Sequence, residues 1–207
     1  MARANVYIGG FNLYYGAVKD TAYKWLNIER LFTLLRNHDD IQRIYYFTAL
    51  IKGSHLLNQL TYVKALATLP RVQVILGKYK LRAVLCNVPG CKYTGNRRFF
   101  VPEEKRTDTQ IALTMAQDAW DDACDLFVLV SGDSDLVPAV GKVKEIAPHK
   151  RILVYVPARD AIRGAAVELR GVADKHRTLP NQLIRRSQFA ASIPDGQGGW
   201  IDKPAGW

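Results

Sequence analysis

Short apolar segments alternate with segments of helical periodicity along most of the chain, and this alternation limits the folds open to it. Apolar segments, several rich in β-branched and aromatic residues, occur at 4–9, 42–50, 72–76, 125–131 and 151–156. Segments with helical spacing lie between and after them, at about 27–35, 55–69, 107–119, 134–146 and 159–173. This order is typical of a mostly parallel sheet with helices on its faces. We therefore predict an α/β fold.

The alternation is interrupted between residues 77 and 102. Two segments there have the composition of hairpin arms, and Pro89-Gly90 between them is a strong turn signal. We expect a β-hairpin inserted into the α/β domain at about 77–102, after which the alternation resumes.

The last part of the chain is rich in Gly, Pro and Ser and shows no period. With 207 residues in all, the chain fits one domain with a short tail. We predict a single domain over 1–180 and an irregular tail over 181–207. The tail is expected to pack on the domain surface through Leu183, Phe189, Trp200 and Trp207, because exposed aromatic side chains forgo the burial of large apolar areas.

The chain is strongly basic, with a formal net charge of +10 and a pI near 9.6. A basic excess of this size favours polyanionic partners, since each neutralised phosphate releases counterions. Lys and Arg side chains that are merely solvated would give the same total. The net charge alone therefore does not decide between a nucleic-acid partner and a basic surface that is merely solvated.

The sequence shows no sign of membrane attachment or secretion. No run approaches the roughly 18 apolar residues that a membrane-spanning helix needs. The first apolar segment is too short and too interrupted for a secretory signal. Three cysteines, an odd number, fit a reducing compartment better than a disulfide framework. We expect a cytoplasmic protein.

Polar residues and glycines follow the ends of two predicted strands. The first strand ends at Gly9-Gly10, with Asn12 just beyond, and the strand at 125–131 ends at Ser131, followed by Asp133 and Asp135. The glycines are not a P-loop, because no Gly-Lys-Ser/Thr follows and no helix is expected to begin there. Ligands of parallel sheets bind outside the carboxyl ends of the strands, near the point where strand order reverses. We therefore expect these residues to face one crevice.

A third acidic position lies at the start of the predicted helix 107–119. Thr107 and Gln110 have the spacing of a capping box, in which the Thr hydroxyl caps a backbone N–H and the Gln side chain reaches back. This places Asp108 in the first turn, where the helix dipole favours its ionised form. Asp108 can then face the same crevice. Each acidic segment can also have a purely structural role instead of binding a ligand. Asp108 can simply be a favourable acid in the first turn of its helix, and Ser134 can cap a turn that joins the strand to the next helix.

Carboxylates that converge at one sheet edge repel one another unless a cation lies between them. Mg²⁺ and Mn²⁺ accept all-oxygen ligands and are commonly held by one or two carboxylates plus substrate phosphates. Such ions generate an attacking hydroxide and stabilise charge on a departing oxygen. An acidic site in a basic chain therefore suits hydrolysis of a phosphodiester chain.

Three motifs, VYI-x-GFNLYYG, EEKRTDTQIALTM and LVSGDSDLVPAV, resemble in order and spacing those of the NYN domain family, the LabA-like branch of the PIN-like nucleases. The resemblance runs from Asn5 to about Arg177. It implies a Rossmann-like sheet and a nuclease site dependent on Mg²⁺ or Mn²⁺. The implied substrate is RNA, single-stranded or structured, in preference to DNA.

The resemblance also implies roles for individual residues. Asn12 corresponds to the first-strand asparagine of the family, which helps to position a metal ligand or the substrate. Asp108 corresponds to the acid at the helix start, and Asp133 to the acid after the fourth core strand, with Asp135 as its companion. Lys105 corresponds to a lysine near the site that can contact a phosphate.

One position departs from the family pattern. The family has an acid at the end of the first strand, in Tyr-Ile-Asp-Gly-Phe-Asn, and this chain has Gly9 there, whereas Gly10 is the expected turn glycine. The resemblance thus implies an endoribonuclease that lacks one metal ligand and is attenuated or inactive. The alternative is a non-catalytic nucleic-acid-binding or scaffolding module. A small-molecule phosphohydrolase fits less well, because its substrate does not require so large a basic excess.

Basic and aromatic residues near the site predict a path for RNA. Single strands are held by phosphate contacts and base stacking. Candidates for phosphate contact are Arg97, Arg98, Lys105 and Arg106, with Ser131 at the strand end and Arg159, Arg163 and Arg170 along a helix. Candidates for stacking are Tyr14, Tyr15 and Phe99, although the two tyrosines can equally pack under the first helix.

Two cysteines flank the predicted hairpin turn. Cys86 and Cys91 stand close to the spacing of a zinc knuckle, but a structural zinc site needs four ligands and no second Cys or His pair follows. Two free thiols at a hairpin tip are therefore the preferred reading, and Cys124 is expected to be buried in the core. A homo-oligomer, which could supply further ligands, is compatible with the sequence.

Overall fold

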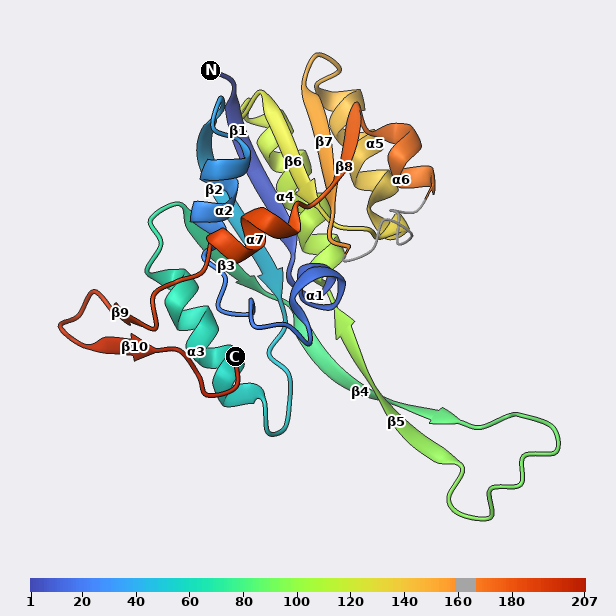
Figure 1. Cartoon of the computed structure of the whole chain (residues 1–207). Coiled ribbons are helices and arrows are strands. Elements are labelled where there is room, and N and C mark those ends of the chain that lie inside the picture. The colour runs from blue at the N-terminus through green and yellow to red at the C-terminus, as the bar shows by residue number, and fades with distance from the viewer. Residues whose placement is uncertain (159–166) are drawn as a thin grey trace.

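The computed structural model describes residues 1–158 and 167–207, and its centre is a six-stranded sheet (Figure 1). The strands lie in the order β3–β2–β1–β6–β7–β8, and every neighbouring pair is parallel. Their bounds are β1 Arg3–Gly9, β2 Asp40–Thr48, β3 Val72–Leu76, β6 Leu126–Val130, β7 Arg151–Val156 and β8 Lys175–Thr178. The predicted α/β fold is confirmed, and β8 is a strand that the sequence pattern did not reveal.

Strand order reverses between β1 and β6. From β1 the chain continues through β2 and β3 on one side, whereas β6, β7 and β8 extend the sheet on the other. In the register of β1 and β6, Ile8 lies opposite Val130, so Gly9 and Ser131 are the first residues beyond this pair. The topological switch point, where parallel sheets commonly bind their ligands, therefore lies beside Gly9 and Ser131.

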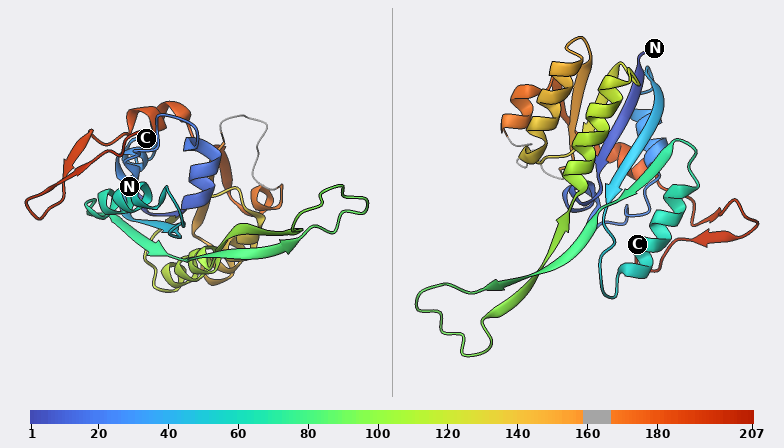
Figure 2. Two further views of the ribbon diagram at one scale, coloured as in Figure 1. Left: turned by 90° about the horizontal axis from the view of Figure 1, so that it is seen from below. Right: turned by 180° about the vertical axis from the view of Figure 1, so that it is seen from behind.

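Helices cover both faces of the sheet (Figure 1, Figure 2). The core on one face includes residues of α2 Ile28–Leu35, α3 Leu56–Ala67 and α7 Asn181–Arg186. The core on the other face includes residues of α4 Thr107–Trp120, α5 Val137–Ile146 and α6 Val167–Val172. No helix in the described ranges has the length and apolar character needed to cross a membrane.

The alternation of side chains along β1 explains why both faces need covering. Val6 and Ile8 belong to the first core cluster, whereas Tyr7 belongs to the second, and all three are fully buried. A strand that is buried on both faces reads as a continuous apolar run, which is how residues 4–9 appear in the sequence.

A short helix follows β1 directly, contrary to expectation. The helix α1 Gly10–Leu13 begins at the second glycine and continues into the π-helical turn η1 Tyr14–Val18. This helix has no side-chain cap, because the residue before it is a glycine, Gly9. The prediction that no helix begins at the glycines is therefore wrong.

The predicted hairpin is present and protrudes from the domain (Figure 1, Figure 2). Its arms are β4 Lys78–Leu85 and β5 Arg98–Lys105, which pair antiparallel. The strand β5 runs past Pro102, so the segment 103–105 belongs to the hairpin and not to the start of a helix.

The predicted capping box at α4 is not formed. The residue before the helix is Arg106, which has a left-handed backbone with φ of 80° and provides no side-chain cap. Thr107 is already the first helical residue, and its hydroxyl donates a hydrogen bond to the carboxylate of Glu104. The side-chain amide of Gln110 donates instead to the carbonyl of Leu76, at 3.4 Å. The N-cap position is therefore Arg106 and not Thr107, because the chain turns at Arg106 between the end of β5 and the first residue of α4.

The last part of the chain contains more regular structure than its composition indicates. It includes α7 and a two-stranded antiparallel sheet of β9 Ser192–Pro194 and β10 Trp200–Asp202. Phe189 and Trp207 both contact the buried Trp25, with ring centroids 5.4 and 6.3 Å from it. Trp200 does not pack as expected, because it is 70% exposed.

The predicted helix at 159–173 is described only in its last part, as α6. Arg159 and Arg163, two of the candidate phosphate contacts, lie outside the described residues. Arg170 lies in the described part of this helix.

Candidate functional site

Hydrogen bonds join the segments that follow β1 and β6. The side-chain oxygen of Asn12, on α1, accepts from the backbone N–H of Gly132 at 3.4 Å. The buried Ser131 hydroxyl accepts from the N–H of Asp133 at 3.1 Å. The carboxylate of Asp133 in turn accepts from the N–H of Asp135, also at 3.1 Å. The sequence SGDSD thus folds into a tight loop at the edge of the sheet.

The cap of this loop is Asp133 and not Ser134. The carboxylate of Asp133 caps the short 3₁₀ helix η2 Ser134–Leu136, which leads into α5. A capping carboxylate keeps at least one oxygen lone pair free, because a single N–H occupies only part of its acceptor capacity. The cap and a ligand can therefore share Asp133.

Asp108 lies in the first turn of α4 and is close enough to the loop for the charges to interact. Burial raises the pKa of the Asp108 carboxyl, and the neighbouring charges of Asp133 and Asp135 raise it further. The expectation that the helix dipole makes ionisation easier here is wrong, because burial and the two like charges outweigh it. The three acids that the sequence singled out are thus electrostatic neighbours.

These acids do not form a complete metal-binding group. Within residues 1–158 and 167–207, no three Asp, Glu, His or Cys side chains come close enough to hold one ion together. The donors are nevertheless carboxylate and amide oxygens, which are the ligands that Mg²⁺ and Mn²⁺ prefer. The donor atoms are therefore of the type that such an ion prefers. Their positions in the described part of the chain do not bring three of the acidic side chains to one ion.

The structure separates the roles of the two glycines. A Cβ on Gly10 would lie 2.8 Å from the carbonyl oxygen of Phe47 and 2.8 Å from the ring of Tyr46, so this position accepts only glycine. A Cβ on Gly9 would meet Asn12 at 3.5 Å and the carbonyl oxygen of Val130 at 3.6 Å, which are ordinary contacts. Packing requires glycine at position 10, whereas position 9 has room for a side chain beside Asn12.

A fourth carboxylate, Glu104, was missed by sequence reasoning. Burial raises its pKa to about 7, and the charge of Asp108 contributes to the rise, while the hydroxyl of Thr107 opposes it. One carboxylate oxygen of Glu104 is buried and has no hydrogen-bond partner. The signal was the pair Glu103-Glu104 at the end of the hairpin, whose pairing in the strand directs alternate side chains to opposite faces.

The basic candidates are spread over a long distance. Lys105 lies at the base of the hairpin, next to α4, and forms an ion pair with Glu103 at 2.7 Å. Arg98 lies at the far end of β5, opposite Leu85, and Arg97 precedes it. Lys105 and Arg106 therefore directly precede α4, whereas Arg97 and Arg98 lie out along the hairpin arm.

The three cysteines are free thiols. Cys86 and Cys91 lie in the distal part of the hairpin and are partly exposed, whereas Cys124 is buried beside Tyr7. No third Cys, His, Asp or Glu joins the hairpin pair among the described residues.

Comparison with known proteins identifies the family. The profile described as NYN domain matches residues 3–180. The chain belongs to the NYN domain family. This is a PIN-like, nuclease-type family, and the open parallel sheet with acids at its switch point agrees with that fold.

Two further likenesses were found for this NYN domain. The 6-hydroxy-3-succinoylpyridine 3-monooxygenase HspA of Pseudomonas putida is 28% identical over 198 residues, which cover 81% of this chain and 63% of that protein. The chain thus spans less than two thirds of that relative's length. A crystal structure of a protein of unknown function from Vibrio parahaemolyticus matches with a TM-score of 0.57 at 18% identity, over 87% of this chain and 94% of the other. At that identity the likeness shows the fold alone.

Proposed function

We propose that this NYN domain is a metal-dependent endoribonuclease, attenuated by Gly9, that hydrolyses phosphodiester bonds of single-stranded RNA. The observation that carries the proposal is the electrostatic coupling of Asp108 to Asp133 and Asp135 at the switch point of the sheet. Carboxylates that raise one another's pKa are typical of functional sites that bind a cation. The basic surroundings favour a polyanionic substrate.

The residues of the site take distinct roles in this proposal. Asp108, Asp133 and Asp135 are the candidate carboxylate ligands of Mg²⁺ or Mn²⁺, and one or two of them would bind the ion directly while substrate phosphates and waters would complete its ligands. When bound, such an ion supplies Lewis-acid stabilisation of phosphate charge and makes a water molecule more acidic. Asn12 holds the segment after β1 to the loop after β6 through Gly132.

Gly9 explains why activity would be weak. Its position adjoins Asn12 and the end of β6, where an acid would complete the donors. A missing ligand plausibly lowers the rate by about 10²–10⁴-fold, or about 3–5 kcal/mol of transition-state stabilisation. A Cβ at Gly9 would make only ordinary van der Waals contacts, which supports the view that an Asp can be placed there.

The test is cleavage of end-labelled single-stranded RNA with Mn²⁺ or Mg²⁺, set against EDTA. The chain with Gly9 and the Gly9→Asp variant are compared, and Gly9→Asp/Asp133→Asn serves as the control for a contaminating nuclease. We expect Gly9→Asp to cleave at least 100-fold faster than the chain with glycine, as a restored ligand requires. Equal, EDTA-insensitive rates in all three proteins would overturn the proposal.

A second candidate is a non-catalytic nucleic-acid-binding module of the same fold. Gly9 and the incomplete group of acids in the described part of the chain favour it. This candidate predicts RNA binding that is unaffected by EDTA, and no cleavage by either the glycine or the aspartate form.

The name of the Pseudomonas relative supports a further possibility, a small aromatic substrate. A thermal-shift titration with 6-hydroxy-3-succinoylpyridine examines it, because a ligand that binds the native state raises the melting temperature. An RNA-dependent shift without a shift from this compound would favour the ribonuclease proposal.

A further inference from the structure

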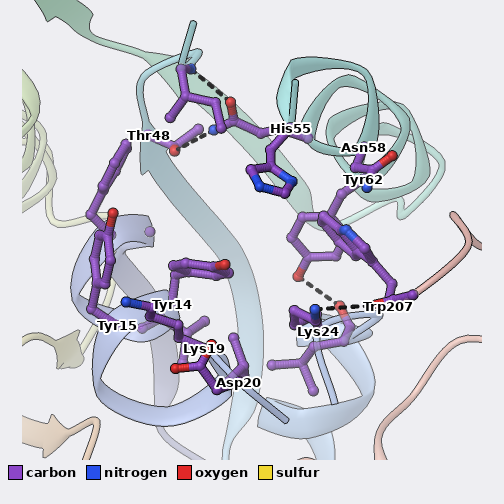
Figure 3. Close-up of a pocket in the computed structure, with 18 of the residues that line it drawn as sticks. Tyr14, Tyr15, Lys19, Asp20, Lys24, Thr48, His55, Asn58, Tyr62 and Trp207 are labelled. Atoms are coloured by element: carbon purple, nitrogen blue, oxygen red, sulfur yellow. Dashed lines mark hydrogen bonds between the residues drawn. The ribbon is translucent and has the colours of Figure 1, made fainter. Parts of the chain in front are cut away.

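A cavity of about 600 Å³ lies beside α1 and η1 (Figure 3). Its walls come from α1 and η1, from the end of β2, from α3, and from residues 205–207. This volume lies within the range of small-ligand sites, about 300–1,000 Å³. The proposed chemistry at the acids makes no use of this space.

Aromatic rings form two facing walls of the cavity. Figure 3 shows Tyr14 and Tyr15 on one side and Tyr62 and Trp207 on the opposite side. The rings of Tyr14 and Tyr15 are 5.1 Å apart and meet edge to face, and those of Tyr62 and Trp207 are 5.5 Å apart. Aromatic walls of this kind suit a planar ring, because flat π-systems stack on one another. Every nucleic-acid base has such a face, so stacking does not depend on the base sequence.

Charged and polar groups complete the lining. Lys19 and Lys24 reach the cavity together with the carboxylate of Asp20. The Lys19 ammonium lies 5.3 Å from the centre of the Tyr15 ring. The side chains of His55 and Asn58 also line the cavity, and within residues 1–158 and 167–207 they have no hydrogen-bond partner. The site therefore offers cations for an anion and unused donors and acceptors for the edge of a heterocycle.

The cavity and the acids lie at the same edge of the sheet. Asn12 of α1 bonds to Gly132 on the β6 side, whereas Phe11 and Tyr14 of the same helical segment line the cavity on the β2 side. Both β2 and β6 are neighbours of β1, so their ends lie about 10 Å apart. A ligand that crosses the end of β1 can occupy both places.

We propose that this cavity holds one base of a single-stranded RNA whose neighbouring phosphodiester lies at Asp108 and Asp133. The base stacks between the tyrosines of η1 and the wall of Tyr62 and Trp207, and Lys19 lies next to its phosphate. The cavity thus selects an unpaired nucleotide, since a base within a duplex cannot enter it. This inference rests on the proposed function, because it takes RNA as the substrate.

Two matched aromatic substitutions test the inference. Tyr15 is 47% exposed and Trp120, at the far end of α4, is 77% exposed, so neither change removes a core side chain. Affinity for a labelled single-stranded RNA is measured by anisotropy in EDTA, where no cleavage occurs. We expect Tyr15→Ala to weaken binding about tenfold, as the loss of one stacked base predicts, and Trp120→Ala to leave it unchanged. Equal affinities for the two variants would overturn the inference.

A spectroscopic probe reports on the base itself. An RNA that carries a single 2-aminopurine loses fluorescence when this base stacks, and we expect quenching with the unsubstituted chain and with Trp120→Ala. Tyr15→Ala should reduce the quenching at saturating protein, an effect that a mere loss of stability would not produce. Lys19→Gln should lower the slope of log affinity against log salt by about 0.7, the value of one phosphate contact on a single strand.

The outcomes separate this inference from the function on which it rests. If no form of the protein binds or cleaves RNA, both fail. If Gly9→Asp cleaves RNA and Tyr15→Ala changes neither affinity nor quenching, the inference alone fails. A free nucleoside monophosphate that binds as tightly as the RNA would also overturn it, because the cavity would then recognise a small molecule.

Discussion

At the scale of single residues, two neighbours of the same amino-acid type can lie in different surroundings, as the pairs Gly9–Gly10 and Glu103–Glu104 show. Gly10 is required because the backbone of Phe47 and the buried ring of Tyr46 leave no room for a Cβ, whereas a Cβ on Gly9 would make only ordinary van der Waals contacts. Glu103 and Glu104 differ in the same way, since Glu103 pairs with Lys105 and Glu104 is partly buried and interacts with the charge of Asp108. Chain neighbours on a strand face opposite sides, and this explains the contrast for the glutamates.

Alanine at the two glycines should separate their roles. Gly10→Ala should destabilise the fold by about 1–3 kcal/mol, because its Cβ collides with the carbonyl of Phe47. Gly9→Ala should change stability by less than about 1 kcal/mol, since its Cβ meets only ordinary contacts. Urea denaturation of both variants measures this, and an equal loss in the two would contradict the steric argument.

Glu104 should make stability depend on pH. Its pKa is about 7 in the folded chain against an ordinary value of 4.5, so folding favours the protonated form. The stabilisation is complete below pH 4.5 and is lost as the pH rises through 7. Glu104→Gln should therefore raise the melting temperature at pH 8 in EDTA by about 2–4 °C, after allowance for partial solvent screening, and by little at pH 4.5.

The matched control for this prediction is Glu103→Gln. The ion pair with Lys105 lowers the pKa of Glu103, so removal of its charge should bring no gain at pH 8. A gain of equal size in both variants would mean that general charge reduction, and not the burial of Glu104, causes the effect.

At the scale of elements, the hairpin β4–β5 does two things. It extends a basic and aromatic arm away from the domain, and its second strand leads through the turn at Arg106 directly into α4. Phe99 and Phe100 are 45% and 64% exposed, and Arg98 lies 6.0 Å from the ring of Phe100. Exposed rings beside cations are the composition of a surface for single strands.

The arm should contribute phosphate contacts. Arg97→Gln/Arg98→Gln should lower the slope of log affinity against log salt by up to about 1.4 for single-stranded RNA, which corresponds to two lost contacts. Arg30→Gln/Arg43→Gln removes the same charge from exposed positions on α2 and β2 and should lower it less. Equal slopes for the two double variants would show that the arm only adds to the net charge.

At the scale of the whole molecule, distant parts of the chain meet around Trp25. This fully buried side chain contacts Phe189 and Trp207, and its indole N–H donates to the carbonyl of Ala190 at 2.7 Å. Trp207 also forms a wall of the cavity. The last segment therefore links the stability of the domain to the shape of the proposed base site.

Two aromatic residues of this segment should behave differently. Phe189→Ala should destabilise the protein by about 1–3 kcal/mol, because it removes a partly buried ring that packs on Trp25. Trp200→Ala should have little effect, since Trp200 is 70% exposed. Differential scanning calorimetry of both variants checks this, and a drop of equal size for Trp200 would contradict the observed packing.

The amino-acid sequence by itself determined the parallel sheet and the inserted hairpin, and it placed Asp133 and Asp135 directly after a core strand. These follow from local information: the period of apolar residues specifies strands and helices, and acids placed just after strands converge at one edge of a parallel sheet. The three motifs also sufficed to predict the family, which the match over residues 3–180 confirmed.

Only the tertiary structure decided the features that depend on contacts between distant segments. The burial of Glu104, the turn at Arg106 and the raised pKa of Asp108 arise where the hairpin meets α4 and the loop after β6. The cavity exists because α3 and residues 205–207 come to lie beside η1. Periodicity and capping rules act over a few residues, whereas burial and electrostatic coupling depend on what the folded chain brings together.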